Sequence, residues 1–512
     1  MSTEDLATRS GTTLPDDPLA AGPTDGPDPK RWLALAVIAV AQLMIILDAS
    51  IVNVALPALQ DDLHVGEANL QWVLTAYTLA FGGLLLLGGR IADFMGRKRV
   101  FVVALVGFAI ASGLGGIAPN SGLLFAARAL QGAFAAMMAP AALSIMTVTF
   151  TDPKERARAF GVFGAISGGG AAIGLILGGI LTEYASWRWT LGVNVPIALV
   201  TAGFAIPLVR ESRAEGDRHF DIPGVLLSAV GLVSLVYGFT KAAEDGWSEP
   251  VTITLLVVAV VLLAAFAVWE TRTSHPLLPT RVIVDRIRGG SYLLFLLAGA
   301  GLFAMFLYLT LYFQRTLGYT PLEAGWAFLP FSGGIIVGAG VVSQLLPKIG
   351  PRPLQITGLT LAVVGMFLLT RIGADSSYVT HVLPSEILIS FGMSSTFVPT
   401  ASTALIGVEP RDAGIASAVL NTAQQVGGSL GLAVLTTIFT SALNGWISDH
   451  PVPDGLQPTP EQLAAGQAEA AVTGYHAAFA SAAGILALAL ITAIFLVKAK
   501  KEDLPAEAAV AA

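Results

Sequence analysis

Long apolar runs alternate with short polar segments along the whole chain. Each run is about 20 residues long, which is the length a helix needs to cross the hydrocarbon core of a bilayer while satisfying its own backbone hydrogen bonds. The pattern predicts an all-α polytopic membrane protein with fourteen transmembrane helices. The runs lie at residues 32–56, 70–89, 100–118, 123–147, 159–181, 191–209, 222–240, 251–269, 291–313, 324–346, 354–369, 383–405, 413–439 and 477–497.

The positions of Lys and Arg predict the orientation, because short cytoplasmic loops hold the excess of both. If both termini are cytoplasmic, the outer loops contain only four of the 28 Lys and Arg residues, namely Arg188, Lys241, Arg315 and Arg371. Arg128 falls inside a run. Because a shift by one span would destroy this asymmetry, we predict an even number of spans with both termini in the cytoplasm.

Composition excludes several classes of function. The 512 residues are 54% hydrophobic and 12% charged, and they include no cysteine, which excludes disulfides and thiolate metal sites. No Gly-rich phosphate loop ends in Lys-Ser or Lys-Thr, and no basic patch accompanies the net charge of -7. We therefore expect no ATP-driven or other enzyme, no cofactor or metal, and no nucleic-acid partner.

An internal repeat predicts the organisation of the runs. The loops after the second and tenth runs align Gly96 with Gly350, and the starts of the fifth and thirteenth runs align at nearly the same offset. Duplicated halves are common in transporters. We expect six helices, two inserted helices and six more. The predicted parts are a disordered cytoplasmic tail (1–31), an N-terminal six-helix bundle (32–210), two inserted helices with a cytoplasmic linker (211–288), a C-terminal six-helix bundle (289–498) with a long outer loop (441–475), and a cytoplasmic tail (499–512).

Two opposite charges, Asp48 and Arg128, stand inside apolar runs. An ionisable residue at the centre of a spanning helix costs about 2.5 to 3.5 kcal/mol on insertion scales, so each requires a functional or structural reason. Asp48 lies too deep for its short side chain to reach the membrane surface, whereas the longer Arg128 side chain retains that alternative. Their similar depth allows a pair in which Arg128 keeps Asp48 ionised until a proton or a cationic substrate competes.

Several motifs, in order, resemble the major facilitator superfamily, and in particular its fourteen-span drug:proton antiporter family of the EmrB/QacA type. The resemblance covers about residues 32–497. The motifs are Leu47 to Pro57 in the first run, Gly89 to Arg99 after the second, Arg128 to Gly132 in the fourth, Trp187 to Trp189 leading to Asn194 to Pro196 near the sixth, and Asn421 to Gly428 in the thirteenth.

The resemblance implies roles for these positions. Asp48 and Arg128 would take part in proton coupling. A cytoplasmic gate would be formed by the loop residues Asp93, Gly96, Arg97, Lys98 and Arg99. The general excess of Lys and Arg in cytoplasmic loops is by itself a sufficient explanation for the three basic residues. Gly170, Gly174, Gly178 and Gly179 resemble the antiporter motif, with Leu175 where the family usually has Pro, and close helix packing is the alternative explanation for these glycines.

Polar side chains inside runs are the candidates for the substrate cavity, because they should point away from lipid. They are Tyr77, Gln131, Asn421, Gln424 and Gln425. Simple hydrogen bonds between helices are an equal alternative. The sequence thus predicts a monomeric, proton-coupled antiporter of the cytoplasmic membrane that exports lipophilic small molecules such as drugs, antibiotics and toxic cations. A dedicated exporter of one endogenous metabolite, siderophore or lipid, and a sensor or scaffold that transports nothing, are the alternatives.

Overall fold

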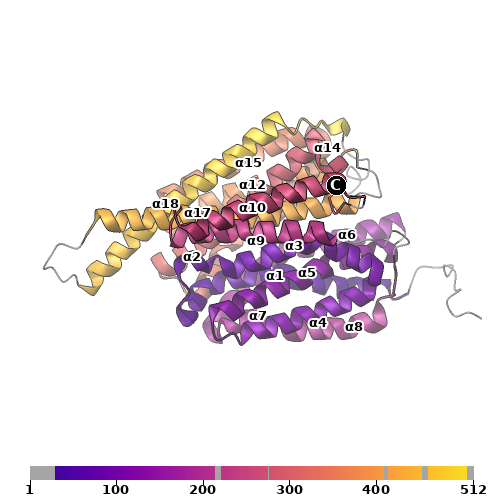
Figure 1. Ribbon diagram of the computed structural model, residues 1–512, viewed down its shortest axis with the longest axis horizontal. Helices are drawn as coiled ribbons and strands as arrows, with labels where there is room; N and C mark the ends of the chain where they lie inside the picture. Colours follow the sequence, from indigo (N-terminus) through magenta and orange to yellow (C-terminus); the bar gives the residue numbers. More distant parts are fainter. Residues whose placement is uncertain are drawn as a thin grey trace, which may run out of the picture.

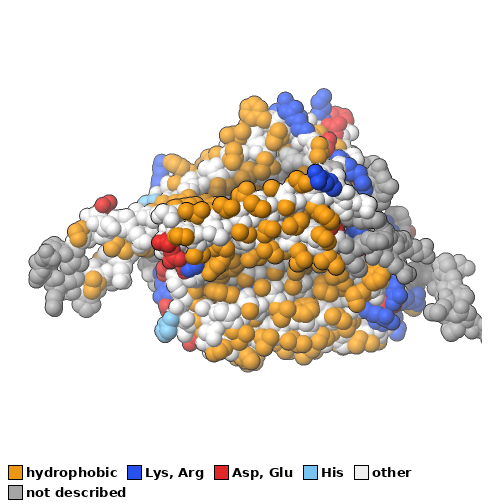
Figure 2. Space-filling model, viewed as in Figure 1, with side chains coloured by type: hydrophobic (Ala, Val, Ile, Leu, Met, Phe, Trp, Pro, Cys, Tyr) orange, Lys and Arg blue, Asp and Glu red, His pale blue; other side chains and the backbone are white. Residues whose placement is uncertain are grey.

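The computed structural model describes residues 29–150, 152–213, 221–274, 276–278, 280–408, 413–451 and 459–503. In this part of the chain the regular structure is entirely helical (Figure 1). Two predicted tails fall largely outside the described residues. They are residues 1–28 of the tail predicted at 1–31 and residues 504–512 of the tail predicted at 499–512. Figure 2 shows hydrophobic side chains over the middle of the molecule and charged side chains at its two ends, as expected of a protein that crosses a membrane.

The N-terminal half packs α1 against α6 and α8, and α5 against α3 and α4. Glycine permits close approach of these helices: a side chain at Gly132 of α5 would lie 2.2 Å from the carbonyl oxygen of Tyr77 in α3. The helices are α1 (Arg31–Leu63), α2 (Glu67–Leu70), α3 (Trp72–Met95), α4 (Arg97–Gly116), α5 (Ser121–Thr149), α6 (Pro153–Tyr184), α7 (Arg188–Gly192) and α8 (Asn194–Leu208).

Two further helices, α9 (Ile222–Glu244) and α10 (Pro250–Arg272), form an antiparallel pair between the halves. Helix α9 packs on both α3 and α17, so it touches each half (Figure 1). Helix α10 is the least buried of the long apolar helices, and its apolar surface is suited to lipid. The short α11 (Thr280–Ile283) leads into the second half.

The C-terminal half packs α12 against α17 and α18, and α16 against α14 and α15. Its elements are α12 (Arg286–Leu311), η1 (Tyr312–Thr316), α13 (Pro321–Ala327), α14 (Leu329–Ile349), α15 (Pro351–Leu368), η2 (Leu369–Arg371), η3 (Tyr378–Val382), α16 (Leu383–Thr403), α17 (Ala413–Asp449), α18 (Pro460–Phe495) and η5 (Lys501–Asp503).

Each of the fourteen predicted runs overlaps one of these helices or a consecutive pair. By length and composition, 11 helices of the described part can cross a membrane, or 12 if the bent pair Glu67–Leu85 and Leu87–Met95 is one span. The fourteen-span count and the cytoplasmic termini stay predictions.

The segment 441–475, predicted as a long outer loop, is largely helical, and its place outside the membrane stays a prediction. Helix α17 continues to Asp449 and α18 begins at Pro460, so helices occupy most of this segment and project from the bundle (Figure 1). The physical reason is local. The segment is rich in Ala and Gln, which favour helix, and Thr459 with Gln462 forms a capping box at the start of α18.

Candidate functional site

Asp48 and Arg128 form an ion pair inside the N-terminal half. Arg128 donates from Nη1 to Asp48 Oδ2 over 2.7 Å, and both side chains are 0% exposed. Asp48 stands near the middle of α1, about 26 Å along the helix from Arg31. The two residues predicted to share a depth therefore meet, away from both lipid and solvent.

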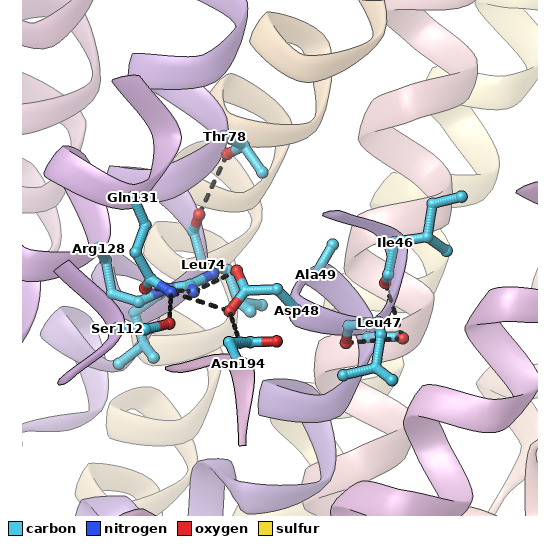
Figure 3. Close-up of polar contacts among 12 residues, drawn as sticks. Ile46, Leu47, Asp48, Ala49, Leu74, Thr78, Ser112, Arg128, Gln131 and Asn194 are labelled. Atoms are coloured by element: carbon cyan, nitrogen blue, oxygen red, sulfur yellow. Dashed lines mark hydrogen bonds and ion pairs between the residues drawn. The ribbon is translucent and has the colours of Figure 1, made fainter. Parts of the chain in front are cut away.

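Two amides complete the hydrogen bonding of this carboxylate (Figure 3). Gln131 donates to Asp48 Oδ1 over 3.0 Å and Asn194 donates to the same oxygen over 2.8 Å. Gln131 also accepts from Arg128 over 2.9 Å and donates to Ser112 Oγ over 2.5 Å. Helices α1, α4, α5 and α8 thus each contribute one or more residues to a single buried network.

Arg128 makes further contacts with α3. Its Nε donates to the carbonyl oxygen of Val73 over 2.9 Å, and its Cζ lies 4.5 Å from the centre of the Tyr77 ring. The guanidinium is therefore fixed by a carboxylate, a carbonyl and an aromatic face. Its remaining nitrogen, Nη2, and the Tyr77 hydroxyl are buried without a hydrogen-bond partner among the described residues.

Chemically, this arrangement can bind and release a proton. Asp48 is the acidic group of this network, whereas the guanidinium of Arg128 keeps its charge and the amides of Gln131 and Asn194 carry none. Protonation of Asp48 would remove the negative charge and leave Arg128 as an uncompensated buried cation, which is strongly unfavourable. A change in protonation therefore favours a change in packing.

The predicted glycine motif forms the surface of α6 that meets α1. A side chain at Gly174 would lie 2.0 Å from Ser50 Oγ, and one at Gly178 would lie 2.5 Å from the carbonyl oxygen of Ile51. Gly170 similarly faces Leu43 and Ile46 of α1. These three glycines hold α6 close to the helix that carries Asp48.

The last glycine of the motif faces the other half. A side chain at Gly179 would lie 2.7 Å from Leu322 Cα in α13, and Leu175 places its carbonyl oxygen 2.7 Å from the position of a side chain at Gly325. One helix therefore contacts both the Asp48 helix and the C-terminal half.

The predicted gate residues contact their own half. Arg97 donates to Asp93 over 2.9 Å, and the backbone N–H groups of Lys98 and Arg99 donate to the carboxylate of Glu211 over 3.1 and 3.2 Å. Gly96 adopts φ +108°, which places the first turn of α4 against Glu211. Among the described residues, these loop side chains form no ion pair with the C-terminal half.

Hydrogen bonds between the halves gather at the end of the bundle that contains α2, which we call the α2 end. Gln314 of η1 donates to the carbonyl oxygen of Val54 over 2.7 Å, and the Leu322 N–H donates to Glu183 over 3.1 Å. The described part of the chain is therefore closed across the halves at this end.

A second contact between the halves lies midway along α3 and α17. Thr78 and Ser429 share a hydrogen bond of 2.6 Å, and Thr422 donates to the carbonyl oxygen of Gly82 over 2.9 Å. At the same level, Gln425 of α17 packs its Cβ on Gly82.

The five candidate cavity residues separate into two groups. Tyr77 and Gln131 belong to the Asp48 network and are buried. Asn421, Gln424 and Gln425 lie on α17, where Asn421 donates to the carbonyl oxygen of Ser417 in its own helix and the two glutamines are half-buried. Among the described residues no hydrogen bond joins the two groups, and a common cavity stays a prediction.

Three residues of the site were not selected from sequence. Asn194 stands within a quoted motif, and Ser112 is a polar residue inside an apolar run, so weak signals exist for both. Glu211 is one of several acidic residues in the charged segment after the sixth predicted run, and its role depends on how α8 ends beside α4. In the described part of the chain, no group of three His, Asp or Glu side chains is arranged to hold a metal ion.

Comparison with known proteins gives the family. The profile described as Major Facilitator Superfamily matches residues 38–432. The chain is 48% identical to the puromycin resistance protein of Streptomyces alboniger, over 95% of each chain. It is 39% identical to the cephamycin export protein of Amycolatopsis lactamdurans, over 80% of this chain and 86% of that protein.

A solved structure has the same fold. It is the inward-facing, unoccupied crystal structure of a bacterial homologue of the human lysosomal transporter Spinster, which aligns with a TM-score of 0.66 at 16% identity, over 94% of this chain and all of that one. Together with the long apolar helices, the family match identifies a multi-pass protein of the cell membrane. The chain belongs to the Major Facilitator Superfamily.

Proposed function

We propose that this chain exports antibiotics and related lipophilic small molecules across the cell membrane in exchange for protons. The observation that carries the proposal is the buried Asp48–Arg128 pair, a titratable group held within the packed helices of a transporter family. The named activities of the relatives, puromycin resistance and cephamycin export, support small-molecule efflux as the direction of transport.

The proposed cycle uses the two ends of the bundle in turn. We take the α2 end as the outer end, as the distribution of Lys and Arg predicts. In the closed-outside arrangement a substrate enters from the cytoplasm between the halves. The halves then rock about the α3–α17 contact and the substrate leaves to the outside. A proton taken up from outside at Asp48 next competes with Arg128 for the carboxylate and returns the protein to the closed-outside arrangement, where the proton leaves to the cytoplasm. In this proposal α9 and α10 are lipid-facing helices between two six-helix bundles. The protein works as a monomer.

The energetics are sufficient for one proton per cycle. A proton that moves through 100 mV releases about 2.3 kcal/mol. One pH unit adds about 1.4 kcal/mol. Together these support a gradient of about several hundredfold for an uncharged substrate.

A dedicated exporter of one compound is the second candidate, because each of the two relatives is named for a single antibiotic. Growth of a susceptible host that expresses the chain separates the two functions. Resistance to puromycin, cephamycin and several unrelated lipophilic compounds supports broad export, whereas resistance to one of them supports a dedicated exporter.

The direct test is transport by purified protein in liposomes. Puromycin should accumulate in vesicles that contain inverted protein when their lumen is made acidic, and a protonophore should abolish the accumulation. Transport that persists unchanged without a proton gradient would refute proton coupling. The absence of movement for every compound that confers resistance would refute export itself.

A further inference from the structure

A second buried carboxyl group lies in the C-terminal half. Glu386 is in the first turn of α16 and is 0% exposed. Its Oε2 lies 3.1 Å from the Tyr378 hydroxyl, and its Oε1 is buried without a hydrogen-bond partner among the described residues. Because no described cation pairs with it, an ionised Glu386 would be an uncompensated buried charge.

The surrounding charged groups are engaged elsewhere or lie at a distance along the helices. Arg371 stacks on Phe367, and His381 shares a hydrogen bond with Thr380. Asp375, on the segment before η3, makes no described contact with the carboxyl. Of the helices packed on α16, α12, α14 and α15 have charged residues only at their opposite ends: Arg286, Arg288, Lys348 and Arg352.

The two acceptors around the Tyr378 hydroxyl favour a proton on this carboxyl. The Tyr378 hydroxyl lies 2.8 Å from the carbonyl oxygen of Ala327 and 3.1 Å from Glu386 Oε2. A phenol has one hydrogen to donate, and a backbone carbonyl can only accept. An ionised Glu386 would have to share the one Tyr378 hydrogen with the Ala327 carbonyl, whereas a neutral Glu386 can donate to Tyr378 while Tyr378 donates to Ala327.

Ala327 is the last residue of α13, the helix that closes the α2 end against the N-terminal half. Helix α13 packs directly on α6, where Gly325 approaches the backbone of Leu175 and the Leu322 N–H donates to Glu183. The Tyr378 hydroxyl therefore links Glu386 to this closing helix.

We propose that Glu386 is a second proton-binding site and that its proton holds α13 in place and the α2 end closed. The inference rests on proton-coupled transport as proposed above. When the site is occupied, Glu386 donates to Tyr378 and Tyr378 donates to Ala327. When the proton leaves to water, the carboxylate accepts the Tyr378 hydrogen, the Ala327 carbonyl loses its donor, and α13 is released from η3.

The absence of cysteine allows a direct measurement of closure. The reporter protein is the full chain with Glu183→Cys and Leu322→Cys, joined by a short thiol cross-linker in membranes without substrate. The cross-linked fraction should fall as pH rises from mildly acidic to mildly alkaline. Loss of one net hydrogen bond corresponds to about a fivefold shift in the ratio of closed to open molecules.

Two variants of the reporter separate the outcomes. Glu386→Gln is always neutral and retains an N–H donor, so its cross-linking should stay high at every pH. Tyr378→Phe removes the link while leaving Glu386 intact, so its cross-linking should be low at every pH. Glu323→Gln, an exposed change in α13 itself, should keep the pH dependence of the reporter.

An unchanged pH dependence in both Glu386→Gln and Tyr378→Phe would overturn the second proton site. This result would not affect the export proposal, because the assay contains no substrate. Conversely, an intact pH response together with no transport of any compound that confers resistance would refute the proposed function and leave Glu386 as a proton-controlled closing device.

Discussion

Arg128 of α5 donates a hydrogen bond of 2.7 Å to Asp48 of α1 where neither side chain reaches the surface. Removing two charges from water costs several kcal/mol per ion, and apolar residues of similar volume often stabilise such sites better. The pair is therefore weak evidence for stability. A charge that changes during transport, as proposed above, would explain why the protein keeps this pair.

Replacement of Asp48 by Asn should abolish gradient-driven transport. The amide keeps the shape of the side chain but cannot exchange a proton, and it leaves Arg128 without a counter-charge. We expect at least about a 100-fold loss of proton-dependent puromycin efflux and a loss of stability of about 3 to 5 kcal/mol. Efflux from inverted vesicles and thermal unfolding in detergent measure the two effects.

Asp62→Asn is the matched control, because Asp62 stands in the same helix but is partly exposed and binds Arg188 and Trp187. Its efflux should stay close to that of the unchanged protein. Full gradient-dependent transport by Asp48→Asn would move proton coupling to another residue.

Arg128→Lys should impair the site although the charge is retained. Lysine cannot reproduce the separate bonds from Nε to Val73 and from Nη1 to Asp48 and Gln131. We expect a loss of about 1 to 3 kcal/mol in stability and slower efflux. Arg371→Lys, at an exposed position, should have little effect on either. Equal melting temperatures for the two variants would show that any positive charge at position 128 is enough to stabilise the site.

The sequence was informative about Asp48 and Arg128 because burial depth follows from position in an apolar run. Whether the two helices face each other depends on tertiary packing, which also decides the roles of Asn194 and Glu211. Glu386 was missed because it lies near the start of its run, where an acidic residue is compatible with the membrane surface. The helices inside the predicted outer loop at 441–475 were not expected, although the Ala and Gln residues there favour helix.

Gly96→Ala should destabilise the predicted gate. Gly96 has φ +108°, and an added Cβ would lie 2.7 Å from Glu211 Oε1, the acceptor for the first turn of α4. We expect a loss of about 1 to 3 kcal/mol and reduced efflux. Gly83→Ala in α3, where nothing lies within 4 Å, is the control and should be neutral. A stable, active Gly96→Ala protein would show that this turn adapts without cost.

The ion pair between Arg31 and Glu155 should give a pH-dependent contribution to stability. Hydrogen bonds of 2.7 and 2.8 Å from Arg31 hold the pKa of Glu155 below its ordinary value of 4.5. A lowered folded-state pKa stabilises the protein above the unfolded value, and this contribution disappears as pH falls through the folded value. The melting temperature should thus exceed that of Glu155→Gln at neutral pH and converge with it in acid. A constant difference at all pH values would contradict an ionic origin.

The glycines of α6 should differ in how well they tolerate a methyl group, and the atoms they face decide the order. At Gly178 the added Cβ meets the backbone carbonyl of Ile51 at 2.5 Å, whereas at Gly174 it meets the side-chain Oγ of Ser50 at 2.0 Å. A backbone carbonyl can move only with its helix, so Gly178→Ala should lose about 2 to 3 kcal/mol without a simple remedy. Gly174→Ala should also be destabilised, but Ser50→Ala should restore a large part of the loss by removing the clashing oxygen.

Gly169→Ala is the control for these changes, because nothing lies within 4 Å of its added methyl group and alanine favours helix. Thermal unfolding of the single and double variants gives the coupling energy between Gly174 and Ser50, expected at about 1 to 2 kcal/mol. Additive effects at this pair would mean that α1 and α6 separate to relieve the contact. In that case we infer that the glycines allow α1 and α6 to move relative to each other. Efflux by Gly174→Ala would then fall even if its melting temperature is unchanged.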